Sequence, residues 1–210
     1  MKQFLTLLFT LHLLIHFSFA QDLQPKSIMQ VSLAADFNGY FQAIEEQDFD
    51  MALDYVFPGL FDLIPRDFMQ ESMEMEASEG EHDIQIKNAK IQPVSKIIED
   101  EMYYYAMISY SYMMEIRSGM EDDWGELEED EDWGSESLNV DDFRRKYGVK
   151  NVFYDANKQI IRVKMKGNMI AVQSKDEFED DGWKFIDLKD DMASMADQLI
   201  PPIILSKLKS

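Results

Sequence analysis

The most regular hydrophobic pattern in the chain lies at residues 102–116, which read MYYYAMISYSYMMEI. The even-numbered residues are all apolar or aromatic, whereas the odd-numbered set is mixed and becomes polar toward Glu115 and Arg117. Successive side chains of a strand point to opposite faces, and aromatic and β-branched residues suit a pleated surface. The pattern therefore predicts a long central strand with one buried face and one half-solvated face.

Helical spacing of apolar residues dominates the chain before this strand. It predicts a helix over about 26–46, and Asp48 is a typical N-cap for a second helix that runs to about residue 56. A third helix is expected over 65–77, because a proline suits its first turn. The apolar segment 57–64 must pack against something, and the mouth of a cavity is one candidate position.

Alternating patterns predict further strands on both sides of the central one. The first is expected at 82–91, where a change of parity near Asn88 indicates a β-bulge. Residues 94–98 are expected to continue it before the chain turns into the central strand. Together these segments predict an antiparallel sheet.

The C-terminal third adds strands at 149–154, 159–173 and 183–188, followed by a helix over about 192–199. Pro201 and its neighbour are expected to end that helix, after which an apolar tail docks on the domain. The long strand predicts an outward-facing basic stripe of Arg162, Lys164 and Lys166. This stripe could meet an acidic partner or the chain's own acidic segment, and a plain solvated sheet face is the alternative.

The segment at about 118–138 is strongly acidic and contains two Asp-Trp-Gly triplets. Low hydrophobicity combined with high charge predicts a mobile loop. Its oxygen ligands could attract calcium, but the glycine of 130–134 comes fifth, whereas an EF-type loop needs it sixth. No specific metal site is therefore predicted here.

The N-terminal residues 1–20 have the pattern of a secretory signal peptide. Lys2 precedes an apolar run, and Ala20 offers a small residue at a cleavage site before Gln21. We therefore expect a secreted protein, periplasmic or extracellular, with one domain over 21–210. No later segment is long and apolar enough to span a bilayer, so stable membrane insertion is not expected.

Charge and composition exclude several kinds of chemistry. The formal net charge is −21 at pH 7, which argues against nucleic acid as a partner. The chain has no cysteine, so disulfides, thiol nucleophiles and thiolate metal sites are absent from the sequence. His82 is the single histidine after residue 20, which makes a transition-metal site of the usual kind implausible. No metal or cofactor is predicted.

Helices followed by an antiparallel sheet define an α+β fold. This order resembles the NTF2-like (cystatin-like) superfamily, and we identify the chain with its secreted bacterial members. The resemblance implies N-terminal helices packed on the concave face of a strongly curved sheet, plus a C-terminal helix. It rests on the helices at 37–41 and 48–56, the long strands at 82–116 and 150–173, and the strand at 182–186. That superfamily includes isomerases, dehydratases, transport factors and binding modules, so the fold alone does not determine the function.

The predicted pocket of such a cone lies between the first helix and the tyrosine-rich face of the central strand. Its candidate lining is Tyr104, Tyr110, Tyr112, Phe37 and Phe41. These residues predict a binding or accessory domain of the cell envelope, with a small apolar ligand or a protein partner. No catalytic residue is assigned, since Asp54 is expected to be a solvated helix residue.

Two alternatives to a binding domain remain open. An isomerase- or lyase-type enzyme would need a carboxylate beside a tyrosine hydroxyl in an open cavity. A binding domain predicts a cavity without such a pair. An interaction or homodimerisation module predicts a cone filled by aromatic residues and methionines, with an apolar patch outside.

Overall fold

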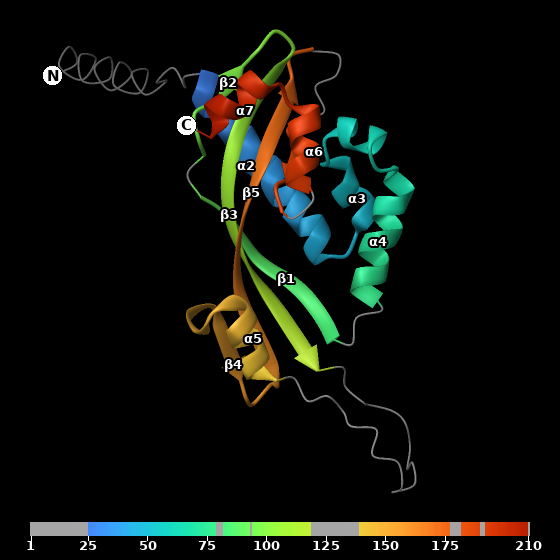
Figure 1. Ribbon diagram of the computed structural model, residues 1–210, viewed down its shortest axis with the longest axis vertical. Coiled ribbons are helices and arrows are strands. Elements are labelled where there is room, and N and C mark those ends of the chain that lie inside the picture. The colour runs from blue at the N-terminus through green and yellow to red at the C-terminus, as the bar shows by residue number, and fades with distance from the viewer. Residues whose placement is uncertain are drawn as a thin grey trace, which may run out of the picture.

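The computed structural model describes residues 25–78, 82–92, 94–118, 139–176, 182–189 and 192–209, and it confirms the α+β class (Figure 1). The helices are α2 (Pro25–Glu45), α3 (Phe49–Asp54), α4 (Arg66–Ser78), α5 (Val140–Tyr147), α6 (Met192–Leu199) and α7 (Pro202–Leu208), with short 3₁₀ helices at Pro58–Asp62 and Val149–Asn151. The strands are β1 (His82–Ile91), β2 (Ile98–Glu99), β3 (Tyr103–Ser118), β4 (Val152–Asp155), β5 (Ile160–Ser174) and β6 (Lys184–Asp187).

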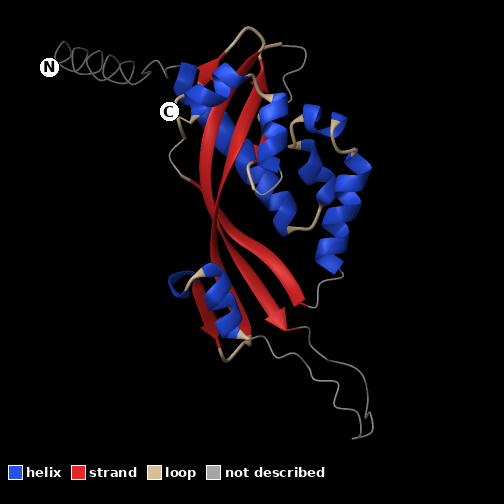
Figure 2. Cartoon of the chain, viewed as in Figure 1, coloured by secondary structure: helices blue, strands red, loops and turns tan. Residues whose placement is uncertain are grey.

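The sheet is antiparallel and strongly curved. Its strand order is β1-β3-β5-β4, with β2 added beside β3 and β6 added beside β5. The long strands β3 and β5 pair along almost their whole length, from Tyr103 opposite Ser174 to Arg117 opposite Ile160. Figure 2 shows these two strands bending through the molecule, with helices on both sides of their upper half.

The inner face of the sheet carries the even-numbered residues of β3, as the alternation predicts. Helix α2 packs on its upper part, where Phe37 and Phe41 contact the Tyr110 ring. At the other end of the same face, Phe143 of α5 packs against a cluster that includes Ile116. Both ends of this face are therefore covered.

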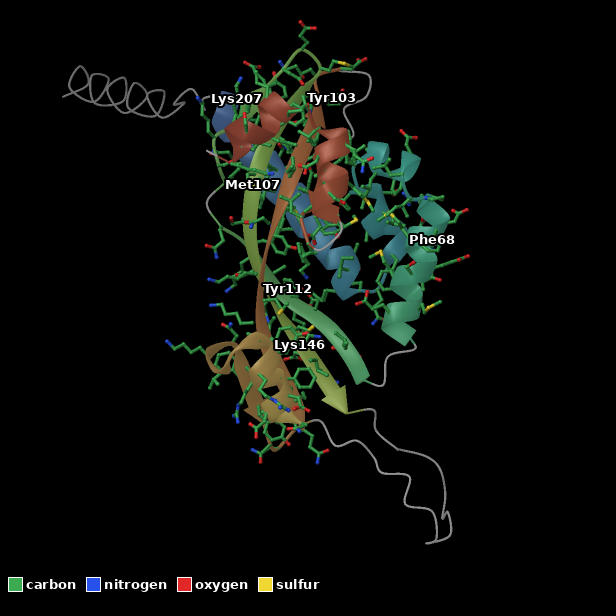
Figure 3. The ribbon with its side chains drawn as sticks, viewed as in Figure 1. Phe68, Tyr103, Met107, Tyr112, Lys146 and Lys207 are labelled. Atoms are coloured by element: carbon green, nitrogen blue, oxygen red, sulfur yellow. The ribbon has the colours of Figure 1, made fainter. Side chains whose placement is uncertain are left out.

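The outer face is covered only in its upper half by described helices. There α6 and α7 pack on odd-numbered residues of β3 and their neighbours on β5. Figure 3 labels Tyr103 and Met107 in this covered part. The buried residues of this second core are Tyr105, Ile170, Val172, Ile186, Ala196, Ile200, Ile204, Leu205 and Leu208.

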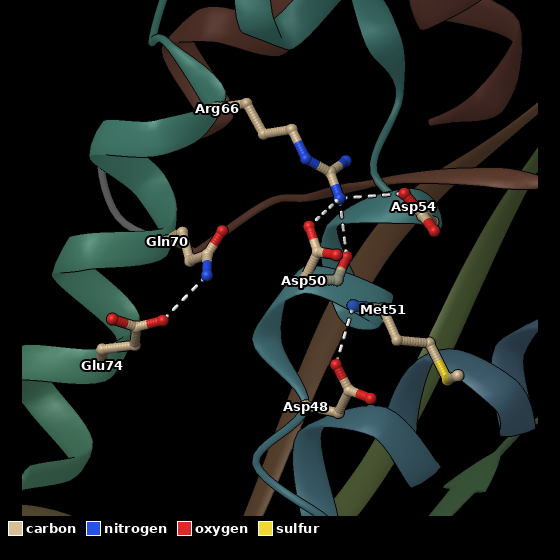
Figure 4. A network of polar contacts seen from close by, with 7 residues as sticks. All are labelled: Asp48, Asp50, Met51, Asp54, Arg66, Gln70 and Glu74. Atoms are coloured by element: carbon tan, nitrogen blue, oxygen red, sulfur yellow. Dashed lines mark hydrogen bonds and ion pairs between the residues drawn. The ribbon is translucent and has the colours of Figure 1, made fainter.

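Local chemistry explains the helical corner formed by α2, α3 and α4. The Asp48 side chain accepts a hydrogen bond of 3.0 Å from Met51 N–H, which confirms the predicted N-cap. At Gly39, a Cβ atom would lie only 2.3 Å from the Tyr55 hydroxyl oxygen, so glycine lets α3 approach α2 closely. Arg66 then joins α4 to the carboxylates of α3 (Figure 4).

Two sequence expectations about element boundaries are wrong. Residues 94–97 are not a strand, and only Ile98–Glu99 pairs with β3. Residues 149–151 form a 3₁₀ helix and not the start of a strand. The apolar tail docks on the sheet as expected, but it does so as a further helix, α7, which Pro202 opens. A proline has no N–H to donate, and the first turn of a helix does not need one. The bulge near Asn88 is confirmed by a register shift and by a φ of 55° at that residue.

Two other predictions fall on residues outside the described ranges. The signal peptide of 1–20 lies there, and so does the acidic loop of 118–138 apart from the end of β3. Among the helices that the structure describes, none combines the length and the apolar character needed to cross a bilayer.

Candidate functional site

A cavity of about 240 Å³ lies between α2, α4 and the inner face of the sheet. Three of its exposed lining residues, Glu45, Gln47 and Glu76, mark the side that opens to solvent. The deeper lining is aromatic and polar, and Figure 3 shows Tyr112 near the bend of the sheet. The other lining residues include Tyr40, Phe41, Ile44, Phe49, Met73, Ile84, Ile86, Tyr110, Asp187 and Lys189.

A carboxylate and a phenol meet at this cavity. The Tyr110 hydroxyl donates a hydrogen bond of 2.9 Å to Oδ2 of Asp187. The backbone N–H of Lys189 donates to Oδ1 of the same carboxylate at 3.2 Å. Asp187 is the last residue of β6, opposite Met169 on β5, whereas Tyr110 comes from β3. The contact therefore joins β3 to β6 across the intervening strand β5.

Backbone hydrogen bonds to the helical corner hold β6 in position. The Phe185 N–H donates to the Tyr55 carbonyl at 2.7 Å, and the Phe57 N–H donates to the Phe185 carbonyl at 3.0 Å. These bonds attach the end of α3 to β6, two residues before Asp187. The carboxylate is thus fixed by main-chain contacts on one side and by the Tyr110 hydroxyl on the other.

The surroundings of Asp187 favour its neutral form. Burial raises the pKa of this carboxyl, and the hydrogen bond from Tyr110 and the charge of Lys189 offset only part of that effect. Burial and the Asp187 charge also raise the pKa of Tyr110. The same two causes raise the pKa of Tyr40. Both phenols therefore remain protonated, and they act as hydrogen-bond donors.

A second polar pair lies beside the first. The Lys189 ammonium donates to the Tyr112 hydroxyl at 2.5 Å, and it lies 4.9 Å from the centroid of the Tyr112 ring. A hydroxyl that accepts one hydrogen bond still has its own proton to donate. Tyr112 can therefore donate a hydrogen bond to an oxygen of a ligand in the cavity.

The structure places the five predicted lining residues in two groups. Tyr110, Tyr112 and Phe41 line the cavity. Phe37 is fully buried in the core, and Tyr104 lies beneath the Lys175 ammonium, 4.7 Å from its ring centroid, so neither lines the cavity.

Asp54, which the sequence predicts to be a solvated helix residue, lies on the surface. Its side chain is 69% exposed and pairs with Arg66. The segment 57–64 does not form the mouth of the main cavity. Instead, it contributes Leu60 to a smaller hollow of about 50 Å³ that shares Tyr40, Met73 and Asp187 with the main cavity.

Sequence reasoning did not single out Tyr40, Asp187 and Lys189. A signal for Asp187 was present, because Trp183, Phe185 and Asp187 alternate along the predicted last strand. The first two are buried in the inner core, with exposed fractions of 0% and 2%. A carboxylate in the next position of a buried face marks a polar group directed toward the interior.

The described residues offer hydrogen-bonding groups to a ligand. In this part of the chain, no group of three or more histidines, cysteines or acidic residues gathers where it could hold a metal ion. The cavity instead combines apolar walls with the Asp187 carboxylate, the Lys189 ammonium and three phenols, from Tyr40, Tyr110 and Tyr112, while Glu45 and Glu76 lie at its open side. Such convergence of a few polar groups in a concave apolar site is typical of small-molecule sites.

Neither a family model nor a curated protein matches the chain. The fold and the cavity by themselves define the class of the protein as an α+β domain with a curved antiparallel sheet and a pocket that has polar groups in its deeper lining.

Proposed function

We propose that this chain is a small-molecule-binding domain of the NTF2-like kind, with its ligand in the cavity between α2, α4 and the sheet. The observation that carries the proposal is an open, largely apolar cavity into which Tyr112 and Lys189 bring hydrogen-bonding groups. The order of N-terminal helices and curved sheet supports the superfamily resemblance.

The cavity supports a small, uncharged ligand. Its volume of about 240 Å³ lies just below the range of about 300–1,000 Å³ that is common for ligand pockets. Glu45 and Glu76 at the open side disfavour anions. Tyr40 and Tyr112 supply donors, so a carbonyl oxygen on an apolar body matches the chemistry of the lining.

A second candidate function is an isomerase- or lyase-type enzyme, and the Asp187–Tyr110 pair favours it, because a carboxylate beside a tyrosine hydroxyl distinguishes this hypothesis from a plain binding domain. Burial also raises the pKa of Asp187. A carboxylate with a raised pKa is a stronger base. Asp187 would take a proton from the carbon beside the ligand's carbonyl and return it at another carbon. The Tyr112 or Tyr40 hydroxyl would stabilise the oxyanion that develops. Tyr110 would hold the carboxylate in position.

The cavity also weighs against the interaction module, which requires a filled cone. The pattern of residues 1–20 supports secretion, with cleavage near Ala20 and work in the periplasm or outside the cell. The mature domain would then begin at Gln21.

The test is a fragment screen by ligand-observed NMR with cyclic and aromatic ketones and lactones. Compounds that bind should lose about tenfold in affinity on Tyr112→Phe, which removes a hydrogen-bond donor, or on Asp187→Asn, which replaces the carboxylate of the cavity by an amide. The matched control is Asp67→Asn, which removes an exposed carboxylate on α4. The absence of any such compound, or equal loss in the control, contradicts the proposal.

The same samples separate binding from catalysis. In D₂O, an enzyme should exchange the protons beside the carbonyl of a bound ketone for deuterium, and Asp187→Asn should abolish this exchange. Binding without exchange supports the binding domain and rejects the enzyme.

A further inference from the structure

The uncovered part of the outer sheet face carries a cluster of cations. Lys87 and Lys164 flank Met113 across the strands, and in the next row Lys90 and Lys166 flank Ser111. Arg162 follows beside Glu115. We refer to this surface as the basic face, and it consists of Lys87, Lys90, Arg162, Lys164 and Lys166.

Glu115, the acidic residue at the edge of this cluster, is already neutralised. Its carboxylate accepts a hydrogen bond of 2.6 Å from Arg162 and lies 3.5 Å from the Lys87 ammonium. The hydrogen bond from Arg162 is the main reason that the pKa of Glu115 is lowered. Glu115 is therefore already paired with cations, and no ion pair joins it to the remaining lysines of the basic face.

The other three lysines of the basic face remain available. Lys90, Lys164 and Lys166 are exposed, and none of them forms an ion pair with any residue that the structure describes. The helices α6 and α7 cover the outer face farther up, and no described helix covers these rows. These ammonium groups are thus open to a partner.

The positive charge of this cluster contrasts with the acidic composition of the whole chain. The sequence contains 41 acidic and 20 basic residues, so a random charged position is acidic in about two cases of three. On this patch, the five cations of the basic face accompany two carboxylates, Glu115 and Asp155, and both of them pair with Arg162. A cationic cluster in an acidic protein is a specific feature of this surface, and charge complementarity predicts an anionic partner.

We propose that the basic face binds an acidic peptide segment of a partner protein in an extended conformation. Lys164 and Lys166 are two residues apart on one strand, so their side chains repeat at about 6.6–6.8 Å. An extended peptide presents its own alternate side chains at the same interval. Carboxylates at every second position therefore meet successive lysines of β5.

The width of the face also suits one extended chain. Lysines on β1 and β5 stand on either side of β3, about 9–10 Å apart. Between them lie Ser111 and Met113, which are partly buried. A long polyanion such as nucleic acid would extend beyond the basic face and be repelled by the rest of a protein whose net charge is −21. A short peptide fits within the basic face and avoids this repulsion.

The experiment is a titration of a labelled ten-residue peptide of alternating Glu and Thr, followed by fluorescence anisotropy. A second peptide of the same composition, with its glutamates in one block, tests the spacing. The triple variant Lys90→Gln, Lys164→Gln, Lys166→Gln should weaken binding of the alternating peptide about tenfold. The affinity should also fall as salt is added.

The matched control removes three other lysines, Lys146, Lys150 and Lys158. They are exposed on α5, on the following 3₁₀ helix and on the β4–β5 turn (Figure 3 labels Lys146). Their replacement by Gln changes the net charge equally and should alter affinity less than twofold. All six lysines are exposed, and circular dichroism verifies that both variants are folded.

Three results overturn the proposal. One is equal weakening in the two triple variants, and another is equal affinity for the block peptide or for a heparin fragment of matched charge. The third is binding that appears only after the acidic residues of 121–136 are neutralised, because the chain's own segment would then be the occupant. These outcomes do not depend on the cavity or on its ligand.

Discussion

Gly167 lies directly opposite Tyr110 in the β3–β5 ladder, and the Tyr110 ring lies against it. A Cβ atom at Gly167 would be 2.4 Å from both Cζ and the hydroxyl oxygen of the ring, far inside van der Waals contact. The missing side chain therefore lets the ring cross β5 toward β6. There its hydroxyl reaches Asp187. The carboxylate–phenol pair of the cavity depends on this glycine.

The Gly167→Ala variant should be destabilised by about 1–3 kcal/mol, because the new methyl group must displace a ring that is 2% exposed. Strand propensity alone predicts the opposite sign, since alanine is favoured over glycine in a strand interior. Urea unfolding measures the difference. Lys164→Ala, an exposed change on the same strand, should stay within about 0.5 kcal/mol. Unchanged stability of Gly167→Ala would show that the ring does not need this space.

The attachment of α2 to β6 gives a second prediction. Asp36 accepts a hydrogen bond of 2.9 Å from the backbone N–H of Trp183, and the Trp183 indole N–H donates to Ser32 at 3.1 Å. Trp183 is fully buried, so an unpaired N–H at this position costs about 1–3 kcal/mol. Asp36→Ala should lose this amount in chemical denaturation. Asp36→Asn keeps a carbonyl acceptor and should lose less than half as much, whereas equal losses would contradict the assignment.

The contacts of Arg66 predict a much smaller effect, although they are more numerous. One guanidinium nitrogen contacts the Asp50 carbonyl at 2.7 Å, the Asp50 carboxylate at 2.8 Å and the Asp54 carboxylate at 2.9 Å (Figure 4). The two carboxylate side chains are 72% and 69% exposed, so water and salt screen the pairs. Arg66→Gln should lower the free energy of unfolding by less than about 1 kcal/mol, and added salt should make this difference smaller. A salt-independent loss above this value would show that the network is structural.

The regular elements could be predicted because their signals are local. Alternation over 102–116 indicated β3 and its inner face, and helical spacing indicated α2 and α3. The outward direction of Arg162, Lys164 and Lys166 followed from the same rule and is confirmed. The start of α7 was missed, because a proline after a helix gives the same signal whether the chain stops or begins a new helix.

The candidate site could be predicted only in part. Tyr110 and Tyr112 were identified because a local pattern places them on the inner face. Asp187 is brought to Tyr110 by the pairing of β6 with β5 and by the space at Gly167. Both causes join residues far apart in the sequence, and no spacing along the chain encodes them.

The pH dependence of stability gives the last prediction, and Asp187 determines its sign. Burial raises the pKa of Asp187 in the folded protein, so the folded state binds the proton more tightly than the unfolded chain does. Linkage then requires that the free energy of unfolding falls as the pH rises from the ordinary carboxyl pKa through the raised value. Asp187→Asn cannot titrate and keeps an oxygen that accepts from Tyr110. Its stability, measured by urea unfolding across this range, should therefore fall less with rising pH.

Glu115 supplies the control with the opposite sign. Its pKa is lowered, chiefly by Arg162. Its contribution to the stability of the folded state is therefore fully present above the ordinary carboxyl pKa and is lost as the pH falls through the lowered value. In a plot of the free energy of unfolding against pH, Glu115→Gln should reduce only the loss of stability below the ordinary carboxyl pKa. Asp187→Asn should reduce only the loss of stability above it. Because the two carboxylates lie on opposite faces of one sheet, a general change in charge would alter both losses alike. A pH profile of Asp187→Asn that parallels the unmodified protein would show that the cavity carboxyl titrates normally, and the argument for acid–base chemistry at this site would fall with it.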